Sequence, residues 1–325
     1  MDDEPATVFH LFPGQGDPGL DSVHLAATRS TVLRDALEET FEEVLHVARA
    51  EGLDHGGSDP HRWRTADFEQ LASGPAGLPQ LLMYATAVAV HRALIRTAGP
   101  PAGLIAVSFG EIAALTAARA LTVADGTRVV CRATGAFRDS PAGVNTVLCA
   151  SWSEVTALLA RTGRPDVVIA CENSPRETVV CGSAPDVTEV ERAATSAGLR
   201  WTRLPLPFLS HHPALAPHAD AFARAIAETP FRPCRIPVHS AVARRVYTSD
   251  EDLAAALARC LVHPVRLPDT LRSAVGAGPA VIFDTGGRGG AARAAHRCLT
   301  DLPARAVTPV RDPEHPWEPR TDRSA

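Results

Sequence analysis

The chain has 325 residues, of which 45% are hydrophobic and 21% are charged, with a formal net charge of −5 at pH 7. These values are typical of a globular protein of roughly two domains with an apolar core. The net negative charge gives no support for nucleic-acid binding, and the absence of any run of about eighteen apolar residues predicts no membrane span. All 32 basic residues are arginine, which excludes a Walker lysine, a lysine Schiff base and a lysine general base.

The first part of the chain alternates short apolar strands with longer helical patterns. We expect strands at 8–12 and 103–107, and helices at 31–50, 79–98, 109–120 and from 121 to about 137. Residues 51–75 are rich in glycine, histidine and aspartate and predict a loop.

From residue 144 the pattern changes to closely spaced strands. Strands are expected at 144–150, 167–171, 178–181 and 201–206, with helices at 152–162 and 185–197. This βαββαβ order is typical of a ferredoxin-like unit. Further elements follow, namely helices at 213–228, 251–260 and 267–276 and strands at 235–240 and 279–284.

Strands separated by helices predict a mainly parallel sheet with functional residues at its carboxyl edge. We therefore predict an α/β fold with a large, hydrolase-like subdomain formed by residues 1–140 and 207–304. A small ferredoxin-like subdomain is inserted at 141–206. The segment 305–325 is rich in proline, arginine and acidic residues and predicts an extended or disordered tail.

The compartment is predicted from the cysteines and the N-terminus. Seven cysteines are scattered without a Cys-x-x-Cys pair, so we expect reduced core residues and no zinc site. The acidic start at Asp2, Asp3 and Glu4 argues against a secretory signal. These features predict a cytoplasmic protein.

Ser108 lies at a predicted strand–turn–helix corner. An apolar run ends at this serine, and an alanine-rich helical pattern begins after Gly110. A nucleophile elbow has this arrangement, because the sharp turn exposes the hydroxyl and the helix N-terminus faces a developing oxyanion. A serine between a strand and a helix is also a common N-cap, and the corner alone does not separate the two interpretations.

Two histidines could serve as the base that such a serine requires. His211 and His212 follow a predicted strand and precede a helix, so either one is a candidate base or a helix cap. Gln15 lies between two glycines after the first strand, where the backbone can approach a ligand closely or simply turn. Arg132 lies in an apolar helical stretch and is either a ligand for an anion or a paired core arginine.

Taken together, these residues resemble the malonyl-CoA:acyl-carrier-protein transacylases and the acyltransferase domains of polyketide synthases. The resemblance covers roughly residues 8–304. It is carried, in matching order, by the segments Phe12-Pro13-Gly14-Gln15-Gly16, Ser108-Phe109-Gly110-Glu111, Arg128-Val129-Val130-Cys131-Arg132, Asn173-Ser174-Pro175, Ser210-His211 with Pro217, His263-Pro264-Val265-Arg266 and Phe283-Asp284-Thr285-Gly286-Gly287.

The resemblance implies a ping-pong acyl transfer by a Ser–His dyad. Ser108 would attack the thioester of an acyl-CoA or acyl carrier protein, and His211 would accept its proton. The backbone N–H groups of Gln15 and Phe109 would form the oxyanion hole. A backbone carbonyl at His263 would orient the histidine, and Arg132 would hold the free carboxylate of a malonyl-type group.

The chain departs from the family pattern beside the serine. The family usually has Gly-His-Ser-x-Gly, whereas this chain has Ala106 and Val107 before Ser108, and Leu78 replaces a common glutamine. These changes predict a more apolar pocket and an acyl group that is larger or less polar than malonyl. The segment from Phe208 through Ser210 to His211 follows neither the His-Ala-Phe-His nor the Tyr-Ala-Ser-His pattern of extender selection. We place Val107, Phe208, Ser210 and His263 with Arg132 among the substrate-binding residues.

The resemblance also implies the partners and the setting. The acceptor would be the phosphopantetheine thiol of an acyl carrier protein, the donor a CoA or carrier-protein thioester, and no cofactor would be bound. The reaction would belong to polyketide or related natural-product biosynthesis, carried out by a discrete enzyme acting in trans. Two alternatives stay open: an acyl-thioester hydrolase that edits wrong acyl groups on the same scaffold, and a non-catalytic docking module.

Overall fold

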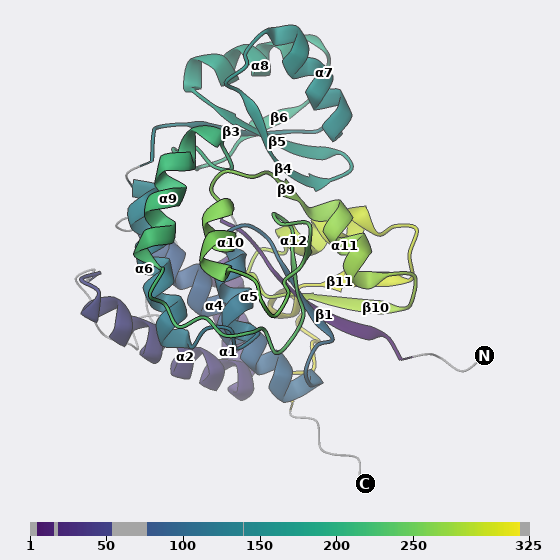
Figure 1. The fold of residues 1–325 in the computed structure, drawn as a ribbon. Coiled ribbons are helices and arrows are strands. Elements are labelled where there is room, and N and C mark those ends of the chain that lie inside the picture. The colour runs from purple at the N-terminus through teal and green to yellow at the C-terminus, as the bar shows by residue number, and fades with distance from the viewer. Residues whose placement is uncertain (1–4, 16–18, 54–76, 139, 319–325) are drawn as a thin grey trace.

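A computed structural model describes residues 5–15, 19–53, 77–138 and 140–318. It divides into a large subdomain and a small one that lies above it in the view of Figure 1. The loop predicted at 51–75 lies mostly outside the described residues.

The large subdomain is built on a six-stranded sheet in the order β11-β10-β1-β2-β7-β8. Every neighbouring pair is parallel except β7 and β8, which are antiparallel. The prediction of a mainly parallel sheet is therefore confirmed. The strands are β1 (Thr7–Phe12), β2 (Gly103–Ala106), β7 (Val238–Ser240), β8 (Arg245–Val246), β10 (Ala280–Asp284) and β11 (Ala304–Val307).

Helices pack around this sheet. They are α1 (Leu20–Arg29), α2 (Thr31–Ala50), α4 (Leu78–Ala98), α5 (Gly110–Ala117), α6 (Val123–Arg138), α9 (Ala216–Ala225), α10 (Leu253–Arg259), α11 (Leu267–Val275) and α12 (Gly290–Cys298), with 3-10 turns at Pro213–Leu215 and Pro309–Arg311. The predicted helices at 31–50, 79–98 and 267–276 are present with boundaries within one residue. The helices α1 and α12 and the strands β8 and β11 of this subdomain were not predicted from the sequence.

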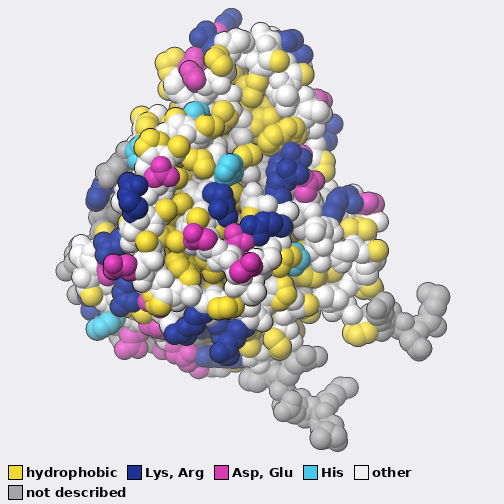
Figure 2. Space-filling model, viewed as in Figure 1, with side chains coloured by type: hydrophobic (Ala, Val, Ile, Leu, Met, Phe, Trp, Pro, Cys, Tyr) yellow, Lys and Arg dark blue, Asp and Glu magenta, His cyan; other side chains and the backbone are white. Residues whose placement is uncertain are grey.

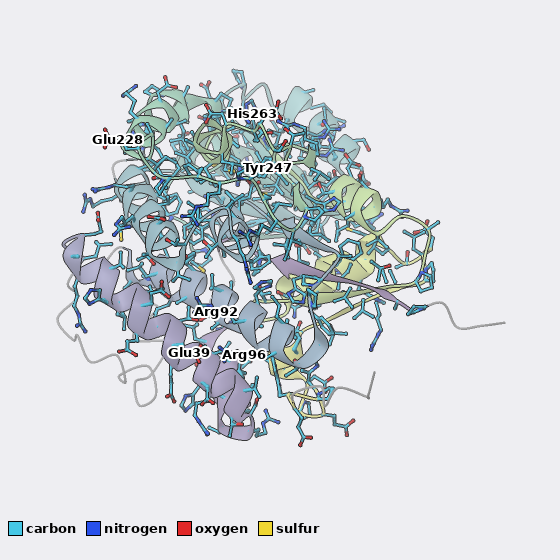
Figure 3. All side chains as sticks on the ribbon, turned by 60° about the horizontal axis from the view of Figure 1, so that its bottom comes forward. Glu39, Arg92, Arg96, Glu228, Tyr247 and His263 are labelled. Atoms are coloured by element: carbon cyan, nitrogen blue, oxygen red, sulfur yellow. The ribbon has the colours of Figure 1, made fainter. Side chains whose placement is uncertain are left out.

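Helix α4 is the central helix of the large subdomain. By length and composition it could cross a membrane, but two thirds of that stretch is buried inside the protein, and it packs against α2, α5 and α6. Its two terminal arginines are paired: Arg96 bonds Glu39 of α2 at 2.5 Å, and Arg92 donates to Thr40 at 2.9 Å (Figure 3). His91 bonds His10 of β1 at 2.8 Å, and burial lowers the pKa of His91 to about 4. The apolar composition of α4 thus reflects a core position.

The small subdomain has the predicted ferredoxin-like order. Its elements are β3 (Val144–Leu148), α7 (Trp152–Thr162), β4 (Val168–Ser174), β5 (Glu177–Gly182), α8 (Ala184–Ser196) and β6 (Trp201–Arg203). The strands are antiparallel in the order β6-β3-β5-β4. Helix α7 begins with a capping box between Ser151 and Glu154, and α7 and α8 enclose a core separate from that of the large subdomain.

The short strand β9 (Val265–Arg266) joins the two subdomains. It lies between α10 and α11 of the large subdomain, yet it pairs in parallel with β4 of the small subdomain. Arg266 forms an ion pair with Glu172 at 2.7 Å and lies 4.3 Å from the ring centre of Trp152. This contact fixes the segment just before it, which includes His263.

The prediction of an extended or disordered tail at 305–325 does not hold for residues 305–318. Strand β11 is an edge strand of the large sheet, and Val310 and Trp317 are buried in the main core. Proline and charge dominate the composition of this segment, but a few well-spaced apolar residues suffice to hold it against the domain.

Candidate active site

Ser108 lies at the sharp turn between β2 and α5. Its φ of 55° is in the left-handed region, which non-glycine residues rarely adopt. The turn is tight: a Cβ on Gly110 would lie 2.4 Å from the Phe12 carbonyl oxygen, and one on Gly14 would lie 3.2 Å from the Ser108 Cβ. The two glycines therefore allow the end of β1 to approach the corner that presents the serine.

His211 faces this serine from the opposite side of the site. Its Nε2 lies 2.7 Å from the Ser108 Oγ, and its Nδ1 lies 2.7 Å from the His263 carbonyl oxygen. A carbonyl oxygen can only accept, so Nδ1 carries the ring proton and Nε2 presents a lone pair to the serine hydroxyl. His211 has a φ of 50°, so both members of the dyad have left-handed backbones.

Burial determines the charge of His211. The side chain is enclosed, and desolvation lowers its pKa to about 4, although the bond to the His263 carbonyl acts in the opposite direction. The imidazole is therefore neutral at pH 7 and able to accept a proton. The His263 side chain is itself exposed, and only its backbone takes part in this arrangement.

The structure separates the two adjacent histidines. The His212 Nδ1 accepts from the Ala214 N–H at 3.1 Å, and its Nε2 lies 2.9 Å from the Asp166 carbonyl oxygen of the small subdomain. His212 is thus the helix cap and His211 the residue beside the serine.

Gln15 and Phe109, predicted to form the oxyanion hole, line the same pocket as Ser108 and His211. Phe109 immediately precedes α5, so its N–H belongs to the helix N-terminus. The Gln15 side chain accepts from Gln80 Nε2 at 2.9 Å, which holds the end of the β1 loop against α4. The role of the two N–H groups stays a prediction.

Two supporting residues were not recognised from the sequence. Asn145 of β3 donates to the carbonyls of Leu206 and Phe208 at 3.1 and 2.9 Å and accepts from the Ser210 hydroxyl. It thereby holds the segment that leads into His211. Glu111 is fully buried in α5 and accepts from Ser240 at 2.5 Å and from Tyr247, which ties the elbow helix to β7. The sequence signal for Asn145 is a polar residue within an apolar strand, and Glu111 belongs to the segment at Ser108 that carries the family resemblance, where no role was assigned to it.

The pocket beside the dyad spans about 470 Å³, including space that is open to solvent. Its walls come from α5, α6, α9, α10 and the segment around His211. The lining residues are Gln15, Ser108, Phe109, Ile112, Ala133, Leu209, Ser210, His211, Leu215, Phe222, Leu257, Cys260 and Leu261. Ser210 is the only residue among the predicted substrate-binding set that lines it.

Three predicted substrate-binding residues lie elsewhere. Arg132 is half-exposed and forms an ion pair with Glu51 of the segment after α2, at 2.8 Å. The next residue, Ala133, is buried and faces the pocket instead, because successive helical residues point about 100° apart. Val107 packs into the core on the other side of the sheet. Phe208 is held by a bridge to Ala142 and is not a lining residue.

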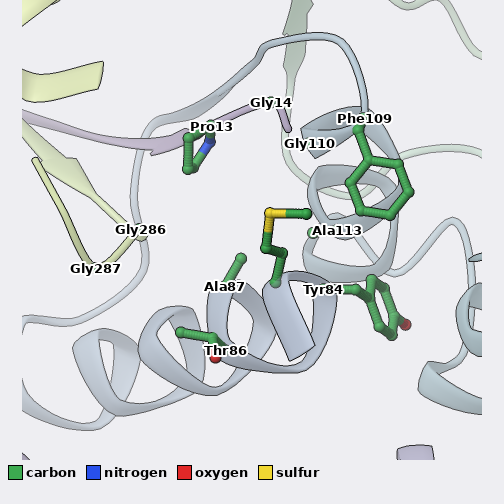
Figure 4. A pocket seen from close by; sticks show the side chains of 11 residues that line it. Pro13, Gly14, Tyr84, Thr86, Ala87, Phe109, Gly110, Ala113, Gly286 and Gly287 are labelled. Carbon is green, nitrogen blue, oxygen red and sulfur yellow. The ribbon is translucent and has the colours of Figure 1, made fainter. Parts of the chain in front are cut away.

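A second cavity, which spans about 370 Å³ including space that is open to solvent, lies behind the elbow. Figure 4 shows Phe109 and Tyr84 at one side of this cavity and Gly286 and Gly287 at the other. Phe109 lines both cavities, so its side chain lies between the pocket at the dyad and the space behind it.

Comparison with known proteins agrees with this architecture. The malonyl-CoA:acyl carrier protein transacylase of Xanthomonas oryzae pv. oryzae superposes with a TM-score of 0.80 at 26% identity, over 94% of this chain and 96% of that one. The acyltransferase domain from the second module of the salinomycin polyketide synthase gives a TM-score of 0.79 at 26% identity, over 96% and 70% of the two chains.

Sequence relatives are parts of much larger proteins. Polyketide synthase GfsA of Streptomyces halstedii is 31% identical over 301 residues, and the spectinabilin polyketide synthase protein NorB of Streptomyces orinoci is 29% identical over 309 residues. The matches cover 91% and 90% of this chain but only 4% and 13% of those relatives. The acyl transferase domain family matches residues 78–310. The chain therefore belongs to the acyl transferase domain family.

Proposed function

We propose that this protein transfers an acyl group from a thioester donor to the phosphopantetheine thiol of an acyl carrier protein through an ester on Ser108. The observation that carries the proposal is the chain of contacts from Ser108 Oγ to His211 Nε2 and from His211 Nδ1 to the His263 carbonyl, each 2.7 Å. These contacts bring together a hydroxyl, a neutral base and a group that orients the base, as nucleophilic catalysis requires.

In the first half-reaction the Ser108 oxygen attacks the thioester carbonyl while His211 Nε2 takes the hydroxyl proton. The tetrahedral oxyanion is stabilised by the N–H groups of Gln15 and Phe109. The C–S bond then breaks, and the leaving thiolate takes the proton from Nε2. In the second half-reaction the carrier thiol gives its proton to Nε2, attacks the serine ester, and Ser108 leaves with that proton.

The fixed carbonyl partner suits both halves of this cycle. When Nε2 is protonated, the Nδ1–H still points at the His263 oxygen, so the ring needs no rotation between accepting and donating. The carbonyl dipole stabilises the imidazolium without itself being ionised, and no acidic third residue is required.

The setting that we propose is polyketide or related natural-product biosynthesis. Polyketide synthases are among the sequence relatives, and an α/β protein of this family matches this chain over almost its whole length. Whether CoA or a carrier protein delivers the acyl group is decided by offering both.

The proposal is tested by intact-protein mass spectrometry. The protein is incubated with acyl-CoA and acyl-pantetheine thioesters, and then with a phosphopantetheinylated carrier protein. We expect an acyl adduct on the wild type, none on Ser108→Ala, and passage of the adduct to the carrier. An adduct on Ser108→Ala would contradict the dyad. Loss of the adduct to water as fast without the carrier as with it would favour the hydrolase.

A further inference from the structure

The pocket that would receive the acyl group contains no positive charge. Apart from the dyad, its lining consists of apolar side chains from four helices and the segments beside them, together with Gln15, Ser210 and Cys260. His211 is the only ionisable nitrogen base in the lining, and it is neutral and occupied at both ring nitrogens. Among the residues that the structure describes, no arginine lines this pocket.

The arginine nearest in sequence is turned away. Arg132 lies one position before the pocket residue Ala133 on α6, and its guanidinium pairs with Glu51 at 2.8 Å. Arg128, one turn earlier, lies 3.7 Å from the same carboxylate and 2.9 Å from Asp125. Both cations are thus engaged on the outer side of α6. To enter the pocket, Arg132 would have to leave its partner and pass across the helix.

A free carboxylate on the acyl group would be buried without a partner. Burying an ionised group without a counter-charge is strongly unfavourable, whereas a methyl group at the same place gains from contact with apolar walls. Ile112, Leu209 and Leu261 offer such walls. Ala133 is 2% exposed and leaves the space on α6 that a longer side chain would fill.

We propose that Ser108 accepts a neutral, aliphatic acyl group and discriminates against acyl groups with a free carboxylate. Ala133 is the residue at which this choice is made, because it is the position on α6 from which a cation could reach the pocket. The inference rests on the proposed acyl transfer and specifies its substrate class.

The test uses two donors of nearly equal shape. Isobutyryl-CoA and methylmalonyl-CoA differ only by a methyl group in place of a carboxylate. We expect the wild type to form the Ser108 adduct at least tenfold faster, per unit donor concentration, from isobutyryl-CoA. Equal rates, or faster reaction with methylmalonyl-CoA, would overturn the proposal.

Two variants at one position separate charge from size. Ala133→Arg introduces a cation, and Ala133→Met introduces a long neutral side chain as its control. We expect Ala133→Arg to shift the donor ratio toward methylmalonyl-CoA by tenfold or more, and Ala133→Met to slow both donors alike. Equal ratios in the two variants would contradict the role of Ala133. If Ala133→Arg does not fold, the comparison of the two donors on the wild-type protein tests the proposal by itself.

Failure of this inference differs from failure of the proposed function. Adducts from the dicarboxylic donor alone would leave acyl transfer intact and reject only the substrate class. No adduct from any CoA or pantetheine thioester on the folded wild type would reject acyl transfer itself.

Discussion

The two ends of the pocket are built differently. At the reactive end, Ser108 and His211 both have left-handed backbones, and each is fixed by specific polar contacts. At the acyl end, Ile112 and Ala133 lie in regular helices and offer only apolar surface. The chemistry thus depends on a strained backbone that is hard to change, whereas the substrate depends on side chains that can change without moving the backbone.

Figure 2 shows that the outside of the molecule is unlike either end. Arginine and acidic side chains lie next to one another across this face of the large subdomain, with apolar side chains between them. Exposed pairs such as Arg244 with Asp269 contribute little to stability. The difference that matters for function is therefore the one between the reactive end and the acyl end of the pocket.

The largest expected effect is at the reactive end. Replacing His211 by alanine removes the base and should lower kcat/KM for acyl transfer by roughly 10²- to 10⁴-fold. His212→Ala is the matched control, because His212 caps a helix and bonds the Asp166 carbonyl. It should lower the melting temperature while the rate changes little. Similar rate losses in both variants would mean that His211 acts mainly by holding structure.

The pH dependence should show the low pKa of the buried base. Since burial lowers the pKa of His211 from 6.5 to about 4, the base stays neutral as the pH falls through 6.5. We expect kcat/KM to stay level below 6.5 and to decline only as the pH approaches 4. A decline centred near 6.5 would show an exposed histidine instead.

The same shift affects stability in a predictable direction. The unfolded chain binds a proton on this histidine below pH 6.5, and the folded chain does so only near pH 4. Stability is therefore full above pH 6.5 and falls between 6.5 and 4, by about 3 kcal/mol for this one group. Because the protein loses stability at low pH, the rates of the pH profile should be measured as initial velocities immediately after a jump to low pH.

Phe109 tests whether the acyl end can be extended. Its ring lies between the pocket and the second cavity behind the elbow. Phe109→Ala keeps the backbone N–H but joins the two spaces, so decanoyl-CoA should gain about tenfold over butyryl-CoA. Ile112→Ala is the control, because Ile112 lines only the first pocket. The same gain in both variants would show that added volume alone, without the second cavity, is sufficient.

The strained backbone at Ser108 has a measurable consequence. Alanine and glycine at 108 both remove the hydroxyl and its bond to His211, but only glycine adopts a φ of 55° without steric penalty. We expect Ser108→Gly to unfold at higher urea concentration than Ser108→Ala, a difference of about 1 kcal/mol in the free energy of unfolding. Equal stabilities would mean that the corner carries no strain.

Much of the fold and half of the site could be predicted from the sequence. Apolar periodicity located the core strands and helices, and the order Gln15, Ser108, His211 identified the residues that the fold brings together. The short strands β8 and β9 were missed because two residues carry no periodicity. Asn145 was missed because its contacts depend on the path of the chain from Leu206 to Ser210.

The position of Arg132 outside the pocket has a physical cause. The side-chain direction turns by about 100° from one helical residue to the next, so Arg132 and its neighbour Ala133 face different surroundings. The positive charge of Arg132 suggested that it binds the substrate, whereas the buried residue that lines the pocket is Ala133. Only the structure shows that Glu51 lies on the outer side to hold the guanidinium.

Arg132→Ala gives the smallest expected effect and the sharpest check on the acyl end. Because Arg132 is half-exposed and pairs with Glu51 outside the pocket, its removal should change stability by less than about 1 kcal/mol. The ratio of isobutyryl to methylmalonyl transfer should stay within about twofold of the wild type, since a side chain outside the pocket does not distinguish the two donors. A selective loss of the methylmalonyl donor would bring the arginine back to the substrate. The guanidinium of Arg132 would then contact the carboxylate of the acyl group, which its position in this structure does not allow.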